Sequence, residues 1–334
     1  MRQPTPLSFM RQTIARRCAL ALLASAALGA SPALAQTYPA RAVKIIVPFA
    51  TGGPADNYAR FMAQRLQEAL GQSFVVDNKP GAGSVIGTDL AAKSPPDGYT
   101  LLMMSNTHTV NETLTPNKPF VLTRDFVGIA PVNFSDLVLV AHPSVQPGNV
   151  ADLIKFAKTR PGRLNYASSG QGTPYHMAGE LFKSMAGVFV VHIPYRGSSG
   201  ARTDILGGQV DLMFDAVTTM TEQVKAGKVK ALATTGRQRS EVMPDVPTVH
   251  ESGLPNFEAT IWLGLMAPKG TPKAIVDRLN EVISKTATQA DVRQLWAKQG
   301  ATPMVMTPAV FDRYIEDDIA KWARVIKSAN IKAE

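Results

Sequence analysis

Three loops rich in glycine, serine and threonine each join a predicted strand to a predicted helix: Ala50–Asp56, Lys79–Ser84 and Ser168–Thr173. Loops of this kind expose backbone N–H groups at a helix N-terminus, where the helix dipole favours a carboxylate or a phosphate. In any single loop the glycines equally serve a tight turn. Because three such loops recur at equivalent ends of strands, the sequence favours an anion-binding site.

Three titratable or charged side chains fall near the same strand ends. His176 lies in the first turn of the helix after the third loop, where it can donate to a ligand or join a capping network. Asp215 ends a predicted strand, so its carboxylate can accept from a ligand amine or hydroxyl, orient water or cap the next helix. Arg196 also follows a strand, and we interpret it either as a cation at the site or as a solvated surface charge.

The motifs of nucleotide-dependent and hydrolytic enzymes are absent from the sequence. The stretch Gly81–Gly87 has the spacing G-x-G-x-x-x-G, which differs from the dinucleotide fingerprint, and no glycine loop continues into the G-K-S/T of a P-loop. There is no G-x-S-x-G elbow and no H-E-x-x-H pair, and the five histidines lack metal-ligand spacing. The sequence therefore predicts no catalytic residue, no metal site and no cofactor.

The first 35 residues have the parts of a secretory signal peptide. Four arginines and no acidic residue precede the apolar run Cys18–Gly29, and Ala33–Ala35 supplies an A-x-A cleavage pattern. The apolar run is shorter than the roughly 20 residues of a transmembrane helix. Cleavage near Ala35 removes the only cysteine and four of the 35 basic residues, so the net charge falls from +9 to +5. We therefore expect an exported, periplasmic protein that binds no nucleic acid.

The rest of the chain alternates short β-rich runs with amphipathic helical segments, which is typical of α/β proteins. The first series predicts three strands and two helices, in the order 43–49, 56–70, 73–77, 84–93 and 99–105. A second series predicts strands and helices in the order 136–141, 150–158, 164–168, 174–185, 188–194, 200–206, 210–214 and 229–234. This order implies parallel sheets with right-handed crossovers, and ligands bind beyond the carboxyl ends of such strands.

Two extended segments, near 126–141 and 257–266, join the two series and predict two hinge strands. The C-terminal part predicts a strand at 260–267 and helices at 272–288, 291–299 and 308–328. Because these helices begin no new sheet, the simplest packing returns them to the first domain. We therefore expect two domains with a cleft between them. Their expected limits are residues 36–136 plus 257–334 for the first domain and residues 137–256 for the second.

Several segments together resemble the solute-binding proteins of the tripartite tricarboxylate transporter family, also called Bug proteins. The matching segments are YPARAVKIIVPFATGGPAD from Tyr38, VDNKPGAGSVIG from Val76, PDGYTLL from Pro96, SGQGTPYHMAGELF from Ser169, IPYRG from Ile193, DILGGQVDLMFD from Asp204 and PDVPTVHESG from Pro244. The resemblance implies an α/β, two-domain Venus flytrap fold of the periplasmic-binding-protein type. Each domain would be a mostly parallel sheet flanked by helices, with two crossover strands at the hinge.

The resemblance also implies which residues hold a small carboxylate ligand. In this family backbone N–H groups, hydroxyls and bridging waters hold one carboxylate. At the matching positions, the first loop would hold the waters through Phe49, Ala50, Thr51 and Gly52. The third strand would contact the ligand through Ser105 and Asn106. The anion pocket of the second domain would be Ser168, Gly172, Thr173 and His176, and the distal end would be Arg196, Gly197 and Asp215.

We therefore expect an extracytoplasmic binding protein that captures an organic acid, a dicarboxylate or an amino acid by domain closure, without catalysis. Its implied partner is either the membrane subunits of a tripartite tricarboxylate transporter or a sensor protein, and we expect a monomer. The alternative is an exported hydrolase or isomerase on a similar two-domain scaffold that uses Asp215 and His176. A nucleophile paired with a base would favour the enzyme, and the sequence motifs reveal no such pair.

Overall fold

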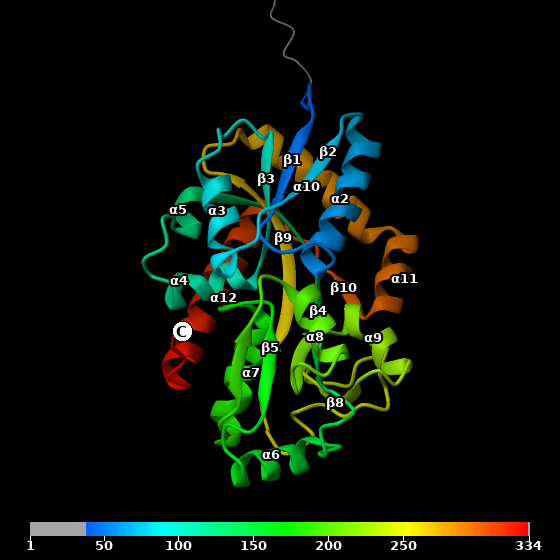
Figure 1. Ribbon diagram of the computed structural model, residues 1–334. Coiled ribbons are helices and arrows are strands. Elements are labelled where there is room, and N and C mark those ends of the chain that lie inside the picture. The colour runs from blue at the N-terminus through cyan, green and yellow to red at the C-terminus, as the bar shows by residue number, and fades with distance from the viewer. Residues whose placement is uncertain (1–37, 333–334) are drawn as a thin grey trace, which may run out of the picture. The chain divides into compact units, whose positions relative to one another are not determined.

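A parallel sheet surrounded by helices forms the first lobe of the protein (Figure 1). The computed structural model describes residues 38–332, so the predicted signal peptide lies outside the described residues. Strand β1 pairs in parallel with both β2 and β3, as the strand–helix alternation predicts. The elements of this series are β1 (Val43–Val47), α2 (Pro54–Leu70), β2 (Phe74–Asn78), the 3-10 helix η1 (Ala82–Ser84), α3 (Val85–Ala92) and β3 (Thr100–Ser105).

Helix α2 shows how local sequence sets these boundaries. It begins at Pro54, two residues earlier than predicted, because the fixed φ and missing N–H of proline suit the first helical position. It ends at Gly71, whose φ of +73° is the left-handed conformation that glycine adopts without steric cost. Its buried face includes Tyr58, Met62 and Leu66, so burial of the apolar stripe fixes the helix against the sheet.

Two helices of the first lobe follow β3 and were not predicted: α4 (Asn106–Leu114) and α5 (Leu122–Asp125). Ser105 caps α4 by accepting the Thr107 N–H at 3.2 Å, and the Nδ1 of His108 accepts the Ser105 N–H at 3.1 Å. This reciprocal capping satisfies donors at the helix start. Helix α4 consists mostly of polar residues, yet nearly all of it is buried. Its sequence therefore lacks the apolar stripe by which helices are predicted.

The second lobe repeats the parallel arrangement, with β5 between β6 and β7. The predicted strand at 229–234 is also present, but it pairs antiparallel with the long strand β4 (Phe126–Ala141) rather than extending the parallel series. The elements of this lobe are α6 (Val150–Thr159), β5 (Asn165–Ser168), α7 (Pro174–Ala186), β6 (Val191–Pro194), α8 (Ser198–Leu206), β7 (Leu212–Ala216), α9 (Val217–Lys225) and β8 (Lys230–Thr234).

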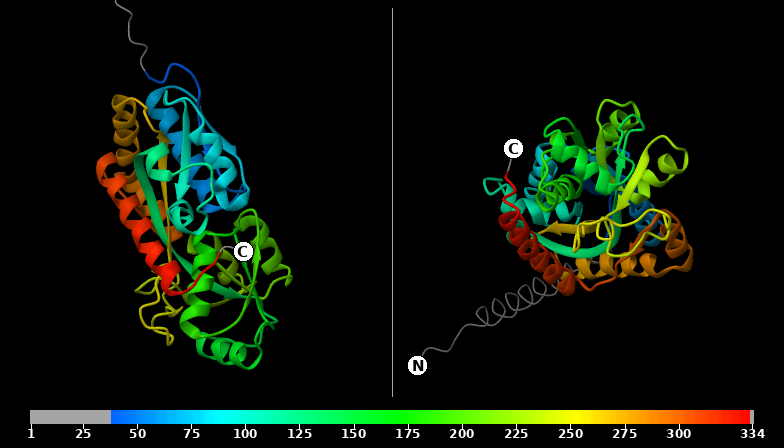
Figure 2. Two further views of the ribbon diagram at one scale, coloured as in Figure 1. Left: turned by 90° about the vertical axis from the view of Figure 1, so that its left-hand side faces the viewer. Right: turned by 90° about the horizontal axis from the view of Figure 1, so that it is seen from below.

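Two long strands, β4 (Phe126–Ala141) and β9 (Thr260–Pro268), join the lobes, and both predicted crossings are confirmed. They pair antiparallel from Phe126 to Asp136 of β4. Beyond that point β4 pairs with β7 and β8 of the second lobe, whereas β9 pairs with β3 of the first. The two hinge strands therefore belong to one continuous hydrogen-bonded sheet. Strand β9 extends from the first lobe toward the second (Figures 1 and 2).

The C-terminal elements contact the first lobe, and α11 (Ala290–Gln299) also contacts α9 of the second lobe. Helix α10 contacts β4 and α2, and helix α12 contacts α4 and β4. Phe311 and Ile315 of α12 join Trp262 of β9 in one apolar core. The domain limits at residues 136 and 257 remain a prediction, because β4 and β9 run through the boundary. The elements are α10 (Lys273–Thr288), α11 (Ala290–Gln299), β10 (Ala301–Pro303) and α12 (Pro308–Ser328).

Among residues 38–332, no helix combines the length and the apolar character needed to span a bilayer.

Candidate ligand-binding site

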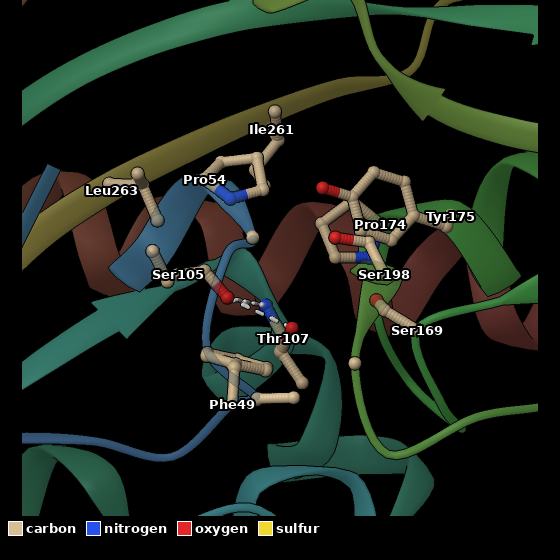
Figure 3. Close-up of a pocket in the computed structure, with 14 residues that line it drawn as sticks. Phe49, Pro54, Ser105, Thr107, Ser169, Pro174, Tyr175, Ser198, Ile261 and Leu263 are labelled. Atoms are coloured by element: carbon tan, nitrogen blue, oxygen red, sulfur yellow. Dashed lines mark hydrogen bonds between the residues drawn. The ribbon is translucent and has the colours of Figure 1, made fainter. Parts of the chain in front are cut away.

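A narrow pocket lies where the two lobes meet, bordered by the crossing strand β9. Its walls lie so close together that it has room for roughly a single water molecule. A solute of several carbon atoms therefore needs the lobes to separate. Lining residues from the two lobes face each other across the pocket (Figure 3). They are Phe49, Ala50, Gly53, Pro54, Ala55, Ser105, Thr107, Ser169, Pro174, Tyr175, Gly197, Ser198, Ile261 and Leu263.

Four helices begin at this pocket, two from each lobe. Pro54 and Pro174 are the first residues of α2 and α7, while Ser105 and Gly197 are the N-caps of α4 and α8. The first N–H groups of a helix have no intrahelical acceptor, and the dipole places partial positive charge at this end. Four such ends border one small pocket whose lining contains no charged side chain, so backbone N–H groups can stabilise a negative charge there.

The lining combines hydroxyl groups with apolar side chains. The Ser105 hydroxyl donates to the Thr107 Oγ1 at 2.9 Å. The Tyr175 hydroxyl is buried beside Ser198 and makes no well-formed hydrogen bond with the described residues. Burial, together with the nearby charge of Asp215, raises the pKa of Tyr175 well above its ordinary value, so this hydroxyl stays protonated as a donor. Apolar walls such as Ile261 and Leu263 suit the carbon chain of a ligand whose ends are polar.

Glycines allow the two lobes to approach closely beside the pocket. A Cβ atom added at Gly197 would lie 2.5 Å from the Cβ of Ala50, and one added at Gly53 would lie 3.0 Å from the Ser198 Oγ. Real Cβ atoms do not approach other carbon atoms so closely. Contact between the first-lobe loop and the start of α8 therefore depends on the missing side chain at Gly197.

Four residues expected from the sequence line the pocket: Phe49, Ala50, Ser105 and Gly197. Thr51 of the same loop is exposed, and the Gly52 N–H donates to the Asp56 Oδ2 at 2.9 Å. Asn106 also lies outside the lining, because its amide Nδ2 donates to the Thr260 carbonyl at 2.8 Å. The Asn106 side chain therefore holds α4 against the crossing strand β9.

The residues expected to form the second-lobe anion pocket are absent from the lining, although two of them directly precede the lining residues Ser169 and Pro174. Gly172 N–H donates to the His176 Nδ1 at 3.2 Å, and the Thr173 Oγ1 accepts the His176 N–H at 3.4 Å. Of the two interpretations of His176, the structure places it in a capping network. Burial, with smaller effects of the nearby charges of His192 and Lys183, lowers the pKa of His176 to about 3. The ring is therefore neutral at physiological pH.

Ser168 and His192 form a serine–histidine pair that sequence motifs do not reveal. The Ser168 Oγ lies 2.6 Å from the His192 Nε2 and accepts the Gly170 N–H at 3.1 Å. Ser168 is fully buried and is absent from the pocket lining. A substrate therefore cannot reach this hydroxyl in the structure, and the hydrogen bonds of the pair connect the loop after β5 to β6.

The charged residues expected at the distal end are arranged differently from the expectation. Arg196 is exposed and does not line the pocket. Asp215 is completely buried, and its Oδ2 accepts from the Nε of Arg202 at 2.9 Å. Its Oδ1 accepts the Ala216 N–H at 2.9 Å, while the N-cap position of α9 belongs to Ala216. The cation near the pocket is therefore Arg202, which stands one helical turn behind the lining residue Ser198.

The pocket-lining residues that were not predicted from the sequence are marked by only weak patterns in the neighbouring sequence. Ile261 and Leu263 alternate on a correctly predicted strand, so they share one face, but the alternation does not say what that face covers. Tyr175 and Ser198 are directly adjacent to residues that were named, at the starts of α7 and α8. Within the described residues, no group of three histidine, cysteine, aspartate or glutamate side chains is placed to hold a metal ion.

Two lobes, two crossing strands and a pocket between the lobes define the class of two-domain periplasmic binding proteins, and solved structures similar to this chain include the periplasmic binding protein BugD. The sequence model described as the tripartite tricarboxylate transporter family receptor matches residues 58–331. The chain belongs to this family, and the resemblance stated from the sequence is confirmed.

Individual relatives match almost the whole chain. Protein BugT of Bordetella pertussis is 40% identical over 305 residues, which cover 91% of this chain and 94% of BugT. The structure of Rpa4515 from R. palustris with adipate has a TM-score of 0.86 and 34% identity, covering 89% of this chain and 100% of that one. MatC from Rhodopseudomonas palustris with bound malate has a TM-score of 0.83 and 32% identity, covering 86% and 100%.

Proposed function

We propose that this protein is an extracytoplasmic solute-binding protein that captures a small dicarboxylate between its two lobes without transforming it. The observation that carries the proposal is the convergence of four helix N-termini on one pocket. Backbone N–H groups at such ends stabilise negative charge, and the hydrogen bonds are charge-assisted. The adipate and malate present in two similar structures support the choice of a dicarboxylate over a singly charged acid.

Closure of the lobes would strengthen binding. When water leaves the pocket, each hydrogen bond to the carboxylate acts in a medium of lower dielectric constant. The ligand shifts the open–closed equilibrium because only the closed state brings donors from both lobes to it. Ser105 and Thr107 would serve one carboxylate from the first lobe, while Ser198 and Tyr175 would serve the other end. The first loop, Phe49–Gly52, would hold bridging waters through its backbone.

The N-terminal sequence supports export. We propose that residues 1–35 direct the chain across the inner membrane and are removed near Ala35, leaving a periplasmic protein without cysteine. The membership of the chain in a transporter-receptor family supports delivery of the ligand to the membrane subunits of a tripartite tricarboxylate transporter. Delivery to a sensor protein is the second role that the proposal allows.

A thermal-shift screen tests the proposed function. The purified protein is first unfolded and refolded to remove co-purified solute, and is then heated with mono-, di- and tricarboxylates, amino acids and aromatic acids. A ligand that binds only the native state raises the melting temperature, and we expect dicarboxylates to raise it most. If no acid changes the melting temperature, the proposal is wrong.

A second measurement separates binding from catalysis. The ligand is recovered from the complex after prolonged incubation and identified by NMR, and we expect it to be chemically unchanged. Asp215 and His176 are the two residues that the alternative enzyme would use. Asp215 is held in an ion pair and His176 in a capping network, and neither lines the pocket. Turnover of the bound acid would support the enzyme instead.

A further inference from the structure

A buried ion pair stands directly behind the second-lobe wall of the pocket. Arg202 on α8 and Asp215 on β7 are joined by a hydrogen bond of 2.9 Å between Nε and Oδ2. The Arg202 side chain is 15% exposed and the Asp215 side chain is not exposed at all. An ion pair removed from water in this way loses much solvation energy, so its position beside the pocket calls for a functional reason.

The guanidinium lies between the carboxylate and the pocket wall. While its Nε donates to Asp215, its Nη2 donates to the Oγ of Ser198 at 3.4 Å, and Ser198 lines the pocket. Both oxygens of Asp215 are already occupied, one by Arg202 and the other by the Ala216 N–H. The positive end of the pair is therefore the end nearer the ligand.

A second polar group at this wall is the hydroxyl of Tyr175. Tyr175 is 3% exposed, and its hydroxyl lies beside Ser198 without a well-formed hydrogen bond to the described residues. This hydroxyl points from the second-lobe wall into the pocket (Figure 3). The charges of Asp215 and Arg202 both act on it, in opposite directions. A buried hydroxyl whose proton has no good acceptor costs free energy, which a ligand acceptor at this end of the pocket would recover.

We propose that Arg202 is a specificity-determining residue, which makes this end of the pocket accept a carboxylate and exclude an ammonium group. This inference rests on the proposed function, because it concerns the same pocket and the same dicarboxylate ligand. Arg202 acts through Ser198, as the positive end of the ion pair. Without Arg202, burial, which already raises the pKa of Asp215, would favour the neutral acid, and the pocket wall would lose the positive group that attracts a second carboxylate and repels an ammonium.

The test compares two ligands that differ by one ammonium group, adipate and 2-aminoadipate. Their dissociation constants are measured by calorimetry at pH 7 for the wild-type protein and for Arg202→Met, which keeps an unbranched chain but removes the charge. The wild type is expected to bind adipate at least about tenfold more tightly than 2-aminoadipate. In Arg202→Met we expect this ratio to fall by about tenfold or more. An unchanged ratio overturns the role of Arg202.

Two further variants separate specificity from folding. Arg163→Met is the matched control, because it removes an exposed arginine of the second lobe that does not line the pocket. Its ratio should equal that of the wild type. If Arg202→Met does not fold, the double variant Arg202→Met with Asp215→Asn decides, because it leaves no buried charge unpaired. A double variant that retains the wild-type ratio overturns the inference.

Failure of the inference is distinguishable from failure of the proposed function. If the wild type binds neither adipate nor any other dicarboxylate, the proposed function itself fails. If the wild type binds adipate but discriminates against 2-aminoadipate no better than Arg202→Met does, the function stands and the assignment of Arg202 is wrong.

Discussion

Gly197 is the residue at which a single methyl group should most affect closure. Its φ of 168° is an extended conformation that alanine adopts freely, so Gly197→Ala introduces no backbone strain. The added Cβ would however lie 2.5 Å from the Cβ of Ala50 and hold the lobes apart. We expect dicarboxylate affinity to fall by about tenfold or more, equivalent to about 1.4 kcal/mol, with little change in the melting temperature of the free protein.

Gly148→Ala is the matched control for this prediction, because a Cβ at Gly148 meets no atom within 4 Å. Calorimetric titration of both variants with the same acid makes the comparison. Equal affinities in the two variants would show that close approach at Gly197 is not needed for binding.

The buried His176 should make stability depend on pH. Its pKa of about 3 in the folded protein lies below the ordinary value of about 6.5. Between these values the unfolded chain binds a proton that the folded chain does not, so stability falls as the pH is lowered below about 6.5. The loss from this residue is about 2 kcal/mol at pH 5.

Urea unfolding at pH 7 and pH 5 measures this loss, and His176→Asn should reduce the difference between the two pH values. The asparagine oxygen can still accept the Gly172 N–H but does not titrate. His108, whose pKa burial lowers to about 4, retains its own contribution in both proteins. A pH dependence unaffected by His176→Asn would mean that His176 does not titrate as described.

The sequence could not predict which individual residues of each loop line the pocket. The loop after β5 was correctly placed at the pocket, yet its lining residue is Ser169, whereas Ser168 is fully buried. Strand residues alternate between faces, so a shift of one position reverses the direction of a side chain. The pairing of Arg202 with Asp215 joins a helix to a strand 13 positions away, and no local pattern encodes such a contact.

At the scale of secondary-structure elements, the packing of α12 against β9 can be tested at Gly264. A Cβ added there would lie 2.4 Å from the Cζ of Phe311 in the first-lobe core. Gly264→Ala should therefore lower the free energy of unfolding by about 1–3 kcal/mol through overpacking. Urea denaturation of this variant beside Gly148→Ala checks the value, and equal midpoints would contradict the observed packing.

Elements with strong hydrophobic periodicity were predicted within a few residues, and this was enough to identify both β–α series and both crossings. Helix α4 was missed because its burial depends on polar contacts. Thr109 donates to the Asp318 Oδ2 of α12 at 2.5 Å, and Asn111 donates to the Gly83 carbonyl at 2.8 Å. The antiparallel direction of β8 was missed because it follows from the path of β4, a contact distant in sequence.

At the scale of the whole molecule, the arrangement of the lobes can be trapped covalently. A Cβ at Gly52 would lie 3.9 Å from the Cβ of Ser199 on the other lobe, which matches disulfide geometry. The positive φ of Gly52 adds strain of roughly 1–2 kcal/mol to any cysteine placed there. The only natural cysteine, Cys18, belongs to the predicted signal peptide, so it should not compete.

We expect the oxidised Gly52→Cys, Ser199→Cys protein to take up and release a dicarboxylate much more slowly than the reduced protein. Stopped-flow exchange before and after reduction measures the effect, and each single variant controls for the substitution itself. Exchange that is equally fast in both redox states would mean that the lobes need not separate.

The crossing strand β9 is both a hinge strand and a wall of the pocket. Ile261 and Leu263 touch the pocket from one face of β9, while the backbone of the same residues pairs with β4 at Ser135 and Asn133. The carbon chain of a bound ligand would therefore contact the same strand that joins the two lobes, with no residue in between. Acids of different length would then set different angles between the two lobes. A partner protein that recognises the degree of closure would distinguish these ligands without contacting them.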